Sequence, residues 1–316
     1  MAERYKIEQS FREWRRLHGV VESMNPDGEP SLKFTYRAEG AEKRPPLTIA
    51  ALPAAFNPLT AAHIELLDTA EVQKSPSELI LILDKKTIDK ELYGASLEDR
   101  LIMLELIAGD RGRISVAFSS HGLFIDKAKA LNKIYPNGTA LYFIVGYDTL
   151  VRLFDSKYYE KRDEALDDLF SISRFLAANR GKSNVASVQE LLSLPQNRKY
   201  ERYVEPISIS DRAAALSSTE IRSKVENEGE LVGLVPPRIE NFIRETGLYR
   251  AVEEGADAHS NLPKNRYEIR SDIMYRLCST KMPPRRDVHV GEMVEALMQG
   301  EDIGVVVERS LKKPGS

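Results

Sequence analysis

The chain has 316 residues, of which 42 % are hydrophobic, so it is long enough to fold around a sizeable core. Its 45 basic and 48 acidic residues are well mixed and give a net charge of −3, so no general attraction to nucleic acid or membranes is predicted. Cys278 is the single cysteine, which excludes an internal disulfide framework and a cysteine-rich metal site. No apolar run is long enough to span a membrane and the first residues do not resemble a signal peptide, so we expect a cytoplasmic protein.

Residues 1–46 are predicted to form an N-terminal extension of one helix and one loop. Apolar residues recur every three or four positions between residues 6 and 24, which predicts a helix that packs one face on the rest of the protein. These residues are Ile7, Phe11, Trp14, Leu17 and Val21. Residues 25–46 are rich in proline, glycine and charge, which indicates a loop with room for a short strand at 32–36.

Between residues 47 and 250, short apolar segments alternate with segments of helical periodicity. The predicted strands are 47–52, 79–84, 113–118, 140–146, 173–178 and 202–207. The predicted helices are 63–73, 97–108, 123–134, 148–154, 185–193 and 218–227. This alternation is typical of an α/β domain with a doubly wound, mainly parallel sheet. In such sheets ligands bind beyond the carboxyl ends of the strands.

Residues 251–316 are predicted to form a C-terminal tail that carries no functional motif. Glu253 to Lys264 is a polar stretch that indicates a linker. Two amphipathic helices are predicted after it, at Tyr267 to Leu277 and Val290 to Met298. Docking on the core and assembly into a homo-oligomer are both open as roles for these helices.

The segment from residue 47 to residue 67 has the pattern strand, loop, helix. Asn57-Pro58 is a turn signal, and Thr60 and His63 follow where the next helix should begin. The first turn of a helix has unpaired backbone N–H groups and partial positive charge. Side chains that bind phosphate at this position would work together with an anion site that is already present.

Four stretches resemble signatures of the cytidylyltransferase-like nucleotidyltransferase superfamily, which includes nicotinamide and nicotinic acid mononucleotide adenylyltransferases. Phe56-Asn57-Pro58-Leu59-Thr60-Ala61-Ala62-His63 resembles its first motif. Leu216-Ser217-Ser218-Thr219-Glu220-Ile221-Arg222 resembles its late Ile-Ser-Ser-Thr-x-x-Arg motif. Ile144 to Asp148 is similar to the Gly-x-Asp segment after the fourth strand, and Leu234 to Tyr249 is similar to the closing helix. The resemblance implies a Rossmann-like nucleotidyltransferase domain over residues 47–250.

The resemblance also implies an activity and a set of site residues. AMP would pass directly from ATP to the phosphate of nicotinamide mononucleotide or nicotinic acid mononucleotide with release of pyrophosphate, a step of NAD biosynthesis. His63, Thr60 and Arg222 would be the catalytic residues. The ATP site would contain His63 and Arg222 together with Phe56, Asn57, Gly146, Asp148, Arg180, Ser218 and Thr219. Mg²⁺ is expected with ATP as a bridge between phosphates, without a metal site of its own.

The acceptor pocket is expected beside the helix that starts near residue 96. Ser96 followed by Asp99 resembles a capping box and predicts the start of this helix. In the family this region helps to form the wall of the acceptor pocket, so Lys90 and Arg100 are candidate contacts to the acceptor phosphate. Exposed, solvated side chains are the competing interpretation for both residues.

The first loop departs from the family pattern. The usual small-residue turn contains two glycines, whereas this chain has Pro53-Ala54-Ala55. A left-handed conformation at either alanine would cost about 1–2 kcal/mol, and each methyl group would narrow the pocket. The expectation is therefore either a loop with a different path or weakened phosphate binding.

Two alternative functions follow from the same residues. One is adenylyl transfer to another phosphorylated acceptor, such as phosphopantetheine. The other is a catalytically inactive nucleotide-binding protein, which Ala54 and Ala55 motivate and which the joint presence of Thr60, His63 and Arg222 opposes. Thr60, like Ser218 and Asp148, is also an ordinary helix-capping residue type. The sequence does not decide between the amide and the acid as acceptor.

Overall fold

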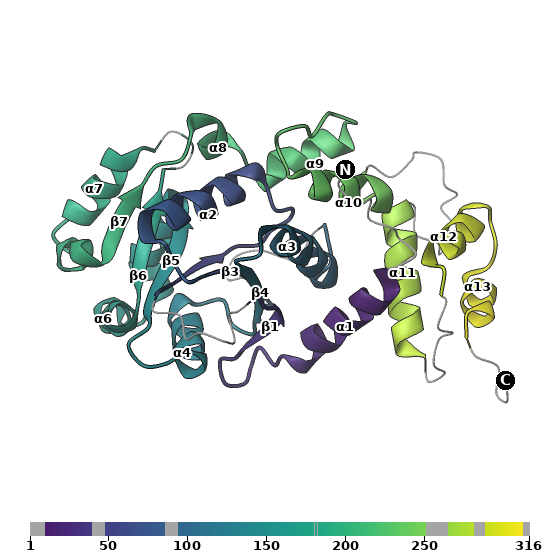
Figure 1. Cartoon of the computed structure of the whole chain (residues 1–316), viewed down its shortest axis with the longest axis horizontal. Helices are drawn as coiled ribbons and strands as arrows, with labels where there is room; N and C mark the ends of the chain where they lie inside the picture. The colour runs from purple at the N-terminus through teal and green to yellow at the C-terminus, as the bar shows by residue number, and fades with distance from the viewer. Residues whose placement is uncertain are drawn as a thin grey trace.

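The computed structural model describes residues 10–39, 48–85, 94–179, 181, 183–250, 265–280 and 288–311. These residues form one sheet with the spatial order β1-β4-β3-β2-β5-β6-β7 (Figure 1). The strands are β1 (Leu32–Tyr36), β2 (Thr48–Pro53), β3 (Glu78–Asp84), β4 (Ile114–Ser119), β5 (Ala140–Gly146), β6 (Arg174–Ala178) and β7 (Val204–Ile207). Every neighbouring pair is parallel except β1 and β4, which are antiparallel. The predicted doubly wound α/β fold is confirmed, and the short strand predicted at 32–36 is the antiparallel edge.

Helices cover both faces of the sheet. They are α1 (Ser10–Ser23), α2 (Ala61–Lys74), α3 (Leu97–Arg111), α4 (Phe124–Ile134), α5 (Tyr147–Phe154), α6 (Arg162–Ile172), α7 (Val185–Ser193), α8 (Asp211–Ala215), α9 (Ser218–Glu226), α10 (Pro237–Thr246), α11 (Arg266–Ser279), α12 (Val290–Met298) and α13 (Ile303–Arg309), with 3₁₀ turns at Ser156–Tyr158 and Arg198–Tyr203. Helices α4 to α7 share a hydrophobic cluster on one face. The other helices share a cluster on the opposite face, including α11, α12 and α13 from the tail.

The strand sequences explain why both faces are covered. In β3, all residues from Glu78 to Leu83 are buried, because alternate side chains face the two helical layers. Ile80 and Ile82 point into one cluster, whereas Leu79, Leu81 and Leu83 point into the other. A continuous apolar run of this kind is typical of a central parallel strand and cannot face water on either side.

Three helices were absent from the predicted pattern: α6, α8 and α13. Helix α6 begins after Lys161 without a capping side chain, and only Leu166, Leu169 and Phe170 of its residues are buried. Helices α8 and α13 are five and seven residues long, too short to show a clear helical period. The tail helices α11 and α12 lie where they were predicted.

The N-terminal helix α1 packs through its predicted apolar stripe. Phe11, Trp14, Leu17 and Val21 are all buried, while Ile7 lies outside the described residues. The Trp14 ring stacks on His18 and meets Tyr275 of α11 edge to face, with ring centroids 4.9 Å apart in the second pair. Figure 1 shows α1 and α11 side by side at one end of the molecule. The N-terminal helix α1 and the tail helix α11 therefore pack against each other.

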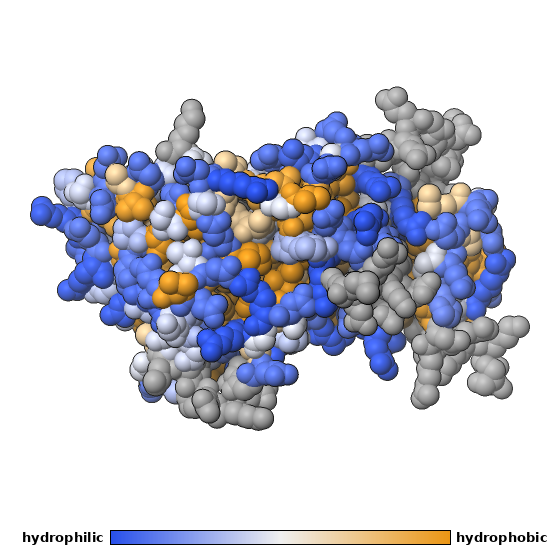
Figure 2. Space-filling model, turned by 45° about the horizontal axis from the view of Figure 1, so that its top comes forward, coloured by the Kyte–Doolittle hydropathy of each residue, from blue (hydrophilic) through white to orange (hydrophobic). Residues whose placement is uncertain are grey.

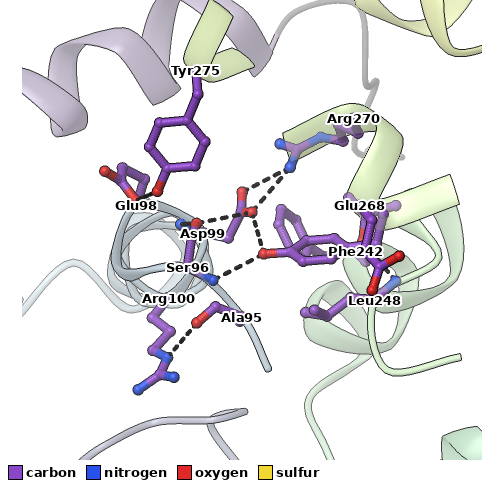
Figure 3. A network of polar contacts seen from close by, with 12 residues as sticks. Ala95, Ser96, Glu98, Asp99, Arg100, Phe242, Leu248, Glu268, Arg270 and Tyr275 are labelled. Atoms are coloured by element: carbon purple, nitrogen blue, oxygen red, sulfur yellow. Dashed lines mark hydrogen bonds and ion pairs between the residues drawn. The ribbon is translucent and has the colours of Figure 1, made fainter. Parts of the chain in front are cut away.

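Helix α11 docks on the first turn of α3 through buried polar groups (Figure 3). Arg270 Nη1 donates to both carboxylate oxygens of Asp99, at 3.0 Å each, and both residues are fully buried. The Tyr267 hydroxyl donates to Asp99 Oδ2 at 2.8 Å and accepts from the backbone N–H of Ser96 at 2.9 Å. Asp99 thus accepts the hydrogen bonds that hold helix α11 of the tail on α3.

Polar and charged residues predominate on the face shown in Figure 2, and hydrophobic residues are exposed mainly across its middle. Among the described residues, no helix is both long and apolar enough to cross a membrane.

Replacing Arg270 with methionine should lower the free energy of unfolding by about 3–5 kcal/mol, because the Asp99 carboxylate would remain buried without its cation. Arg276→Met on the same helix is the matched control, since its pair with Asp272 is partly exposed. We expect the control to change stability by less than about 1 kcal/mol. Urea unfolding of both variants provides the measurement, and equal losses would contradict the role of the buried pair.

Candidate active site

A cavity of about 760 Å³ opens at the carboxyl ends of the central strands. Its walls come from the β2–α2 loop, the end of β3, the β4–α4 loop and the first turns of α5 and α9. The predicted site residues that line it are Phe56, Asn57, His63, Arg100, Gly146, Asp148, Ser218, Thr219 and Arg222. Arg180 and Lys90, which were also predicted, lie outside the described residues. The cavity therefore collects its lining from segments that are far apart in the chain.

The β2–α2 loop follows a path that avoids strain at the two alanines. The backbone N–H of Ala54 donates to the carbonyl of Ile82 at 3.2 Å, which extends the pairing of β2 with β3. The residue with a positive φ is Phe56, at 44°, and neither alanine is among the described residues with positive φ. The Asn57-Pro58 peptide bond, one residue further along the loop, is cis. The sequence analysis expected either a loop with a different path or weakened phosphate binding, and the structure shows the different path.

Asn57 joins three separate parts of the site. Its side-chain oxygen accepts from the Tyr249 hydroxyl at 2.6 Å and from the backbone N–H of Ala95 at 3.2 Å. Its backbone carbonyl accepts from Arg222 Nη1 at 2.7 Å. The bonds that are seen at Asn57 therefore fix the loop to the start of α3 and to the segments after α8.

Thr60 and His63 interact at the start of α2. The backbone N–H of Thr60 donates to His63 Nδ1 at 3.0 Å, and the Thr60 hydroxyl lies 2.9 Å from the same nitrogen. A backbone N–H can only donate, so Nδ1 must be an acceptor, and the proton of the neutral ring belongs on Nε2. Thr60 is buried and does not line the cavity, whereas His63 does. The threonine thus orients the histidine and sets its tautomer.

Helix α9 brings the second motif against the first. Ser217 caps the helix by accepting from the backbone N–H of Glu220 at 3.1 Å. Ser218 Oγ donates to the carbonyl of Pro58 at 2.9 Å, across 160 positions of sequence. Arg222 Nη2 donates to Thr219 Oγ1 at 3.1 Å. The bonds of Ser218 to Pro58 and of Arg222 to Asn57 therefore join the two motifs directly.

The β5 and β6 side of the cavity is built by another strand-to-helix turn. Gly146 ends β5 and is the N-cap of α5, and Asp148 lies in the first turn of that helix. Asn179, which the sequence analysis did not single out, lines the cavity after β6. Its side chain donates to the carbonyl of Ile209 at 3.0 Å and accepts from the Ile209 N–H at 2.8 Å. Because these bonds join two loops that are 30 positions apart, only the fold identifies this residue.

Arg100 is buried, with 3 % of its surface exposed, so it is not a solvated surface residue. Its Nε donates to the carbonyl of Ala95 at 2.9 Å and Nη1 donates to the carbonyl of Ala55 at 3.3 Å. Burial lowers the pKa of the Arg100 guanidinium, and the Arg222 cation lowers it further. Arg100 and Arg222 therefore both face the cavity, where a bound anion would reduce the repulsion between the two cations. The helix that carries Arg100 begins as predicted, because the Ser96 side chain accepts a hydrogen bond from the N–H of Asp99.

Asp84 and Lys127 form a pair that the sequence analysis missed. Lys127 is 1 % exposed, its Nζ lies 3.0 Å from Asp84 Oδ2, and it donates to the carbonyl of Gly122 at 2.6 Å. Burial raises the pKa of the Asp84 carboxyl to about 6, although the Lys127 ammonium opposes this shift. The signal in the sequence was an acidic residue that ends a buried strand at the binding edge of a parallel sheet.

Comparison with known proteins identifies the family. The sequence profile described as Cytidylyltransferase-like matches residues 51–224, which is more than half of the chain. The chain belongs to this family. The match contains both motifs of the cavity.

Individual relatives agree with the Cytidylyltransferase-like assignment. The chain is 27 % identical over 216 residues to a Schizosaccharomyces pombe protein named as a predicted nicotinamide mononucleotide adenylyltransferase, covering 63 % of this chain and 85 % of the relative. It is 27 % identical over 213 residues to a Desulfitobacterium hafniense protein named as a predicted nicotinate-nucleotide adenylyltransferase, covering 65 % and 97 %. A solved structure of Plasmodium falciparum nicotinic acid mononucleotide adenylyltransferase complexed with NaAD is similar in fold, with a TM-score of 0.50 and 19 % identity over 64 % of this chain and 97 % of that one.

Gly94 is required where α3 approaches the first loop of this Cytidylyltransferase-like site. Its φ is +84°, and an added Cβ would lie 2.9 Å from the Tyr249 ring and 3.0 Å from Asn57 Oδ1. Gly94→Ala should therefore lower the free energy of unfolding by about 1–3 kcal/mol more than Gly112→Ala. Gly112 has a similar φ of +64° but no atom within 4 Å of its added Cβ, so it reports the backbone cost alone. Urea unfolding compares the two, and equal losses would contradict the proposed close approach.

Proposed function

We propose that this protein is an adenylyltransferase that transfers AMP from ATP to nicotinamide mononucleotide or nicotinic acid mononucleotide and releases pyrophosphate. The family match and the names of the relatives support this activity. The observation that carries the proposal is the junction of the two motifs, because His63 and Arg222 line the same cavity at two helix starts. The reaction is the one in NAD biosynthesis that makes the dinucleotide.

The chemistry needs no protein nucleophile. The phosphate of the acceptor attacks the α-phosphorus of ATP, a bond forms between them, and the bond to pyrophosphate breaks in line. The protein then contributes positioning and neutralisation of charge. Hydrogen bonds from charged groups contribute about 1.5–3 kcal/mol each, compared with about 0.3–1 kcal/mol from a helix terminus. We therefore assign the larger part of the stabilisation to side chains.

The proposed roles follow from where each side chain lies. His63, held by Thr60 with its proton on Nε2, would donate to the phosphate at the reacting centre. Ser218, Thr219 and Arg222, at the start of α9, would hold the β and γ phosphates as pyrophosphate departs. Their position beside the first loop would place the leaving group next to the attacked phosphorus.

The nucleoside of ATP would lie on the β5 and β6 side of the cavity. Gly146 leaves room for a close approach, and Asp148 offers a carboxylate at the start of α5. Phe56 and Asn57 form the adjacent wall. Arg180, in the undescribed part next to Asn179, remains a candidate on the same side by resemblance alone.

Mg²⁺ would enter with ATP rather than reside in the protein. Among the described residues, no cluster of three possible His, Cys, Asp or Glu ligands is present. Magnesium is often held by phosphates, water and one or two carboxylates, and Asp148 and the hydroxyls of Ser218 and Thr219 are oxygen donors that fit such an arrangement. When bound, the ion would neutralise phosphate charge and help to orient the triphosphate.

Arg100 is the described residue that we assign to the phosphate of the acceptor. It enters the cavity from α3, close enough to Arg222 for their charges to interact. An acceptor phosphate between these two cations would be near the reacting centre. Lys90, which lies outside the described residues, stays a candidate by resemblance alone.

Other partners and the location remain proposals. We propose ATP and a mononucleotide as the small-molecule partners, a cytoplasmic location, and no binding to nucleic acid or membranes, in line with the balanced charge. A homo-oligomer is compatible with this function. Phosphopantetheine is the alternative acceptor, and an inactive nucleotide-binding protein is the alternative of another class; the observed path of the Ala54-Ala55 loop removes one reason for the latter.

Pyrophosphate release with ATP and Mg²⁺ tests the proposal. Nicotinamide mononucleotide, nicotinic acid mononucleotide and phosphopantetheine are offered in parallel. We expect turnover with at least one of the two mononucleotides, and His63→Ala should reduce kcat by about 10²–10³, as for loss of one preorganised transition-state contact.

His289→Ala is the control, because this histidine is exposed at the N-cap of α12 and should leave turnover unchanged. Turnover only with phosphopantetheine would transfer the assignment to that acceptor. ATP binding without any turnover would favour the inactive binding protein.

A further inference from the structure

The Arg100 guanidinium is positioned by the two residues that precede helix α3. Its Nε donates to the carbonyl of Ala95 at 2.9 Å, and the backbone N–H of Arg100 donates to the carbonyl of Ser96 at 3.0 Å. Both the side chain and the main chain of Arg100 are therefore bonded to this dipeptide. Whatever holds the dipeptide in place also sets how the guanidinium meets a ligand in the cavity.

The dipeptide is held by the first loop of the site and by the tail. The backbone N–H of Ala95 donates to Asn57 Oδ1 at 3.2 Å. The backbone N–H of Ser96 donates at 2.9 Å to the hydroxyl of Tyr267, which lies in the first turn of α11. A helix outside the region that matches the family thus bonds directly to the main chain beside Arg100.

The Tyr267 hydroxyl joins the cap of α3 to the first turn of that helix. Besides accepting from the Ser96 N–H, it donates to Asp99 Oδ2 at 2.8 Å, and the same oxygen accepts from Ser96 Oγ at 3.1 Å. Burial raises the pKa of the Tyr267 hydroxyl, so the hydroxyl keeps the proton that it donates to Asp99. These bonds are shielded from water because Tyr267, Ser96 Oγ and Asp99 meet in the interface between α3 and α11.

The attachment of α11 does not depend on this hydroxyl. Arg270 Nη1 binds both carboxylate oxygens of Asp99 from the next turn of α11 (Figure 3). The Tyr275 ring packs on Trp14 of α1. Loss of the Tyr267 hydroxyl would therefore leave the tail docked and release only the start of α3.

We propose that Tyr267 is a positioning residue for the acceptor, whose hydroxyl holds the start of α3 where Arg100 meets the acceptor phosphate. This inference rests on the proposed function, in which Arg100 binds that phosphate. Without the hydroxyl, the Ser96 N–H loses its acceptor and the start of the helix can shift. ATP would be affected less, because the proposed function assigns it to the first loop and to the first turns of α5 and α9.

The test compares the KM of the mononucleotide with the KM of ATP, each at a saturating concentration of the other substrate. The mononucleotide is the one that gives the higher turnover. We expect Tyr267→Phe to raise the KM of the mononucleotide by about tenfold and that of ATP by less than about twofold, since a misplacement of about 1 Å can cost up to about 10²-fold. KM does not depend on the amount of folded enzyme, so a general loss of stability would not produce this difference.

Tyr275→Phe is the matched control, because it removes a hydroxyl from the same helix. This hydroxyl lies 3.5 Å from Glu98 Oε2, at the limit of a hydrogen bond, and no bond from it to Ala95 or Ser96 is found among the described residues. We expect both KM values of the control to stay within about twofold of the wild type. A rise in the mononucleotide KM equal to that in Tyr267→Phe would overturn the proposal.

A double variant asks whether the effect passes through Arg100. In the Arg100→Met background, Tyr267→Phe should change kcat/KM for the mononucleotide, per folded protein, by less than about twofold, because the side chain that it positions is gone. Losses that multiply in the double variant would show that Tyr267 acts elsewhere and would overturn the proposal. Should Arg100→Met fail to fold, the two KM values of Tyr267→Phe decide alone.

The failure of this inference differs from the failure of the proposed function. Unchanged KM values in Tyr267→Phe, or an equal rise in both, would overturn the inference while the wild type still turns over a mononucleotide. Turnover with neither mononucleotide by the wild type would reject the proposed function and this inference with it.

Discussion

The site depends on one junction, in which Asn57 joins three parts of the chain by hydrogen bonds. Its carbonyl holds Arg222 of α9, and its side chain holds Tyr249 and the backbone before α3. Ser218 adds a bond to Pro58 beside it. Each bond alone is modest, about 0.5–1.5 kcal/mol in net stability. Together they fix the distance between the two motifs, and transfer of a nucleotidyl group depends on such positioning.

The tail extends this junction to the far end of the molecule. Tyr267 and Arg270 hold the first turn of α3 from outside, through Ser96 and Asp99. The same turn carries Arg100, which reaches into the cavity on its inner side. The helices outside the matched family region therefore support a residue of the proposed acceptor site, and the tail belongs to the same hydrophobic cluster as α1 and α3.

Charge is distributed unevenly within the cavity. Arg100, Arg222 and the start of α9 gather positive charge where phosphates would react. Asp84 and Lys127 form an ion pair in another part of the lining, so their charges largely cancel there. This division suits a substrate whose phosphate end is anionic and whose aromatic end is not, since each end then meets an environment of matching charge.

The sequence by itself determined the features that depend on neighbours a few residues apart. These include the alternation of strands and helices, the Ser96 cap of α3 and the two helix-start motifs. Only the tertiary structure decided where strain falls in the first loop, because pairing of Ala54 with Ile82 leaves the positive φ to Phe56. It also decided the pairing of Asp84 with Lys127, since the partner of a buried charge is set by packing between distant segments rather than by local pattern.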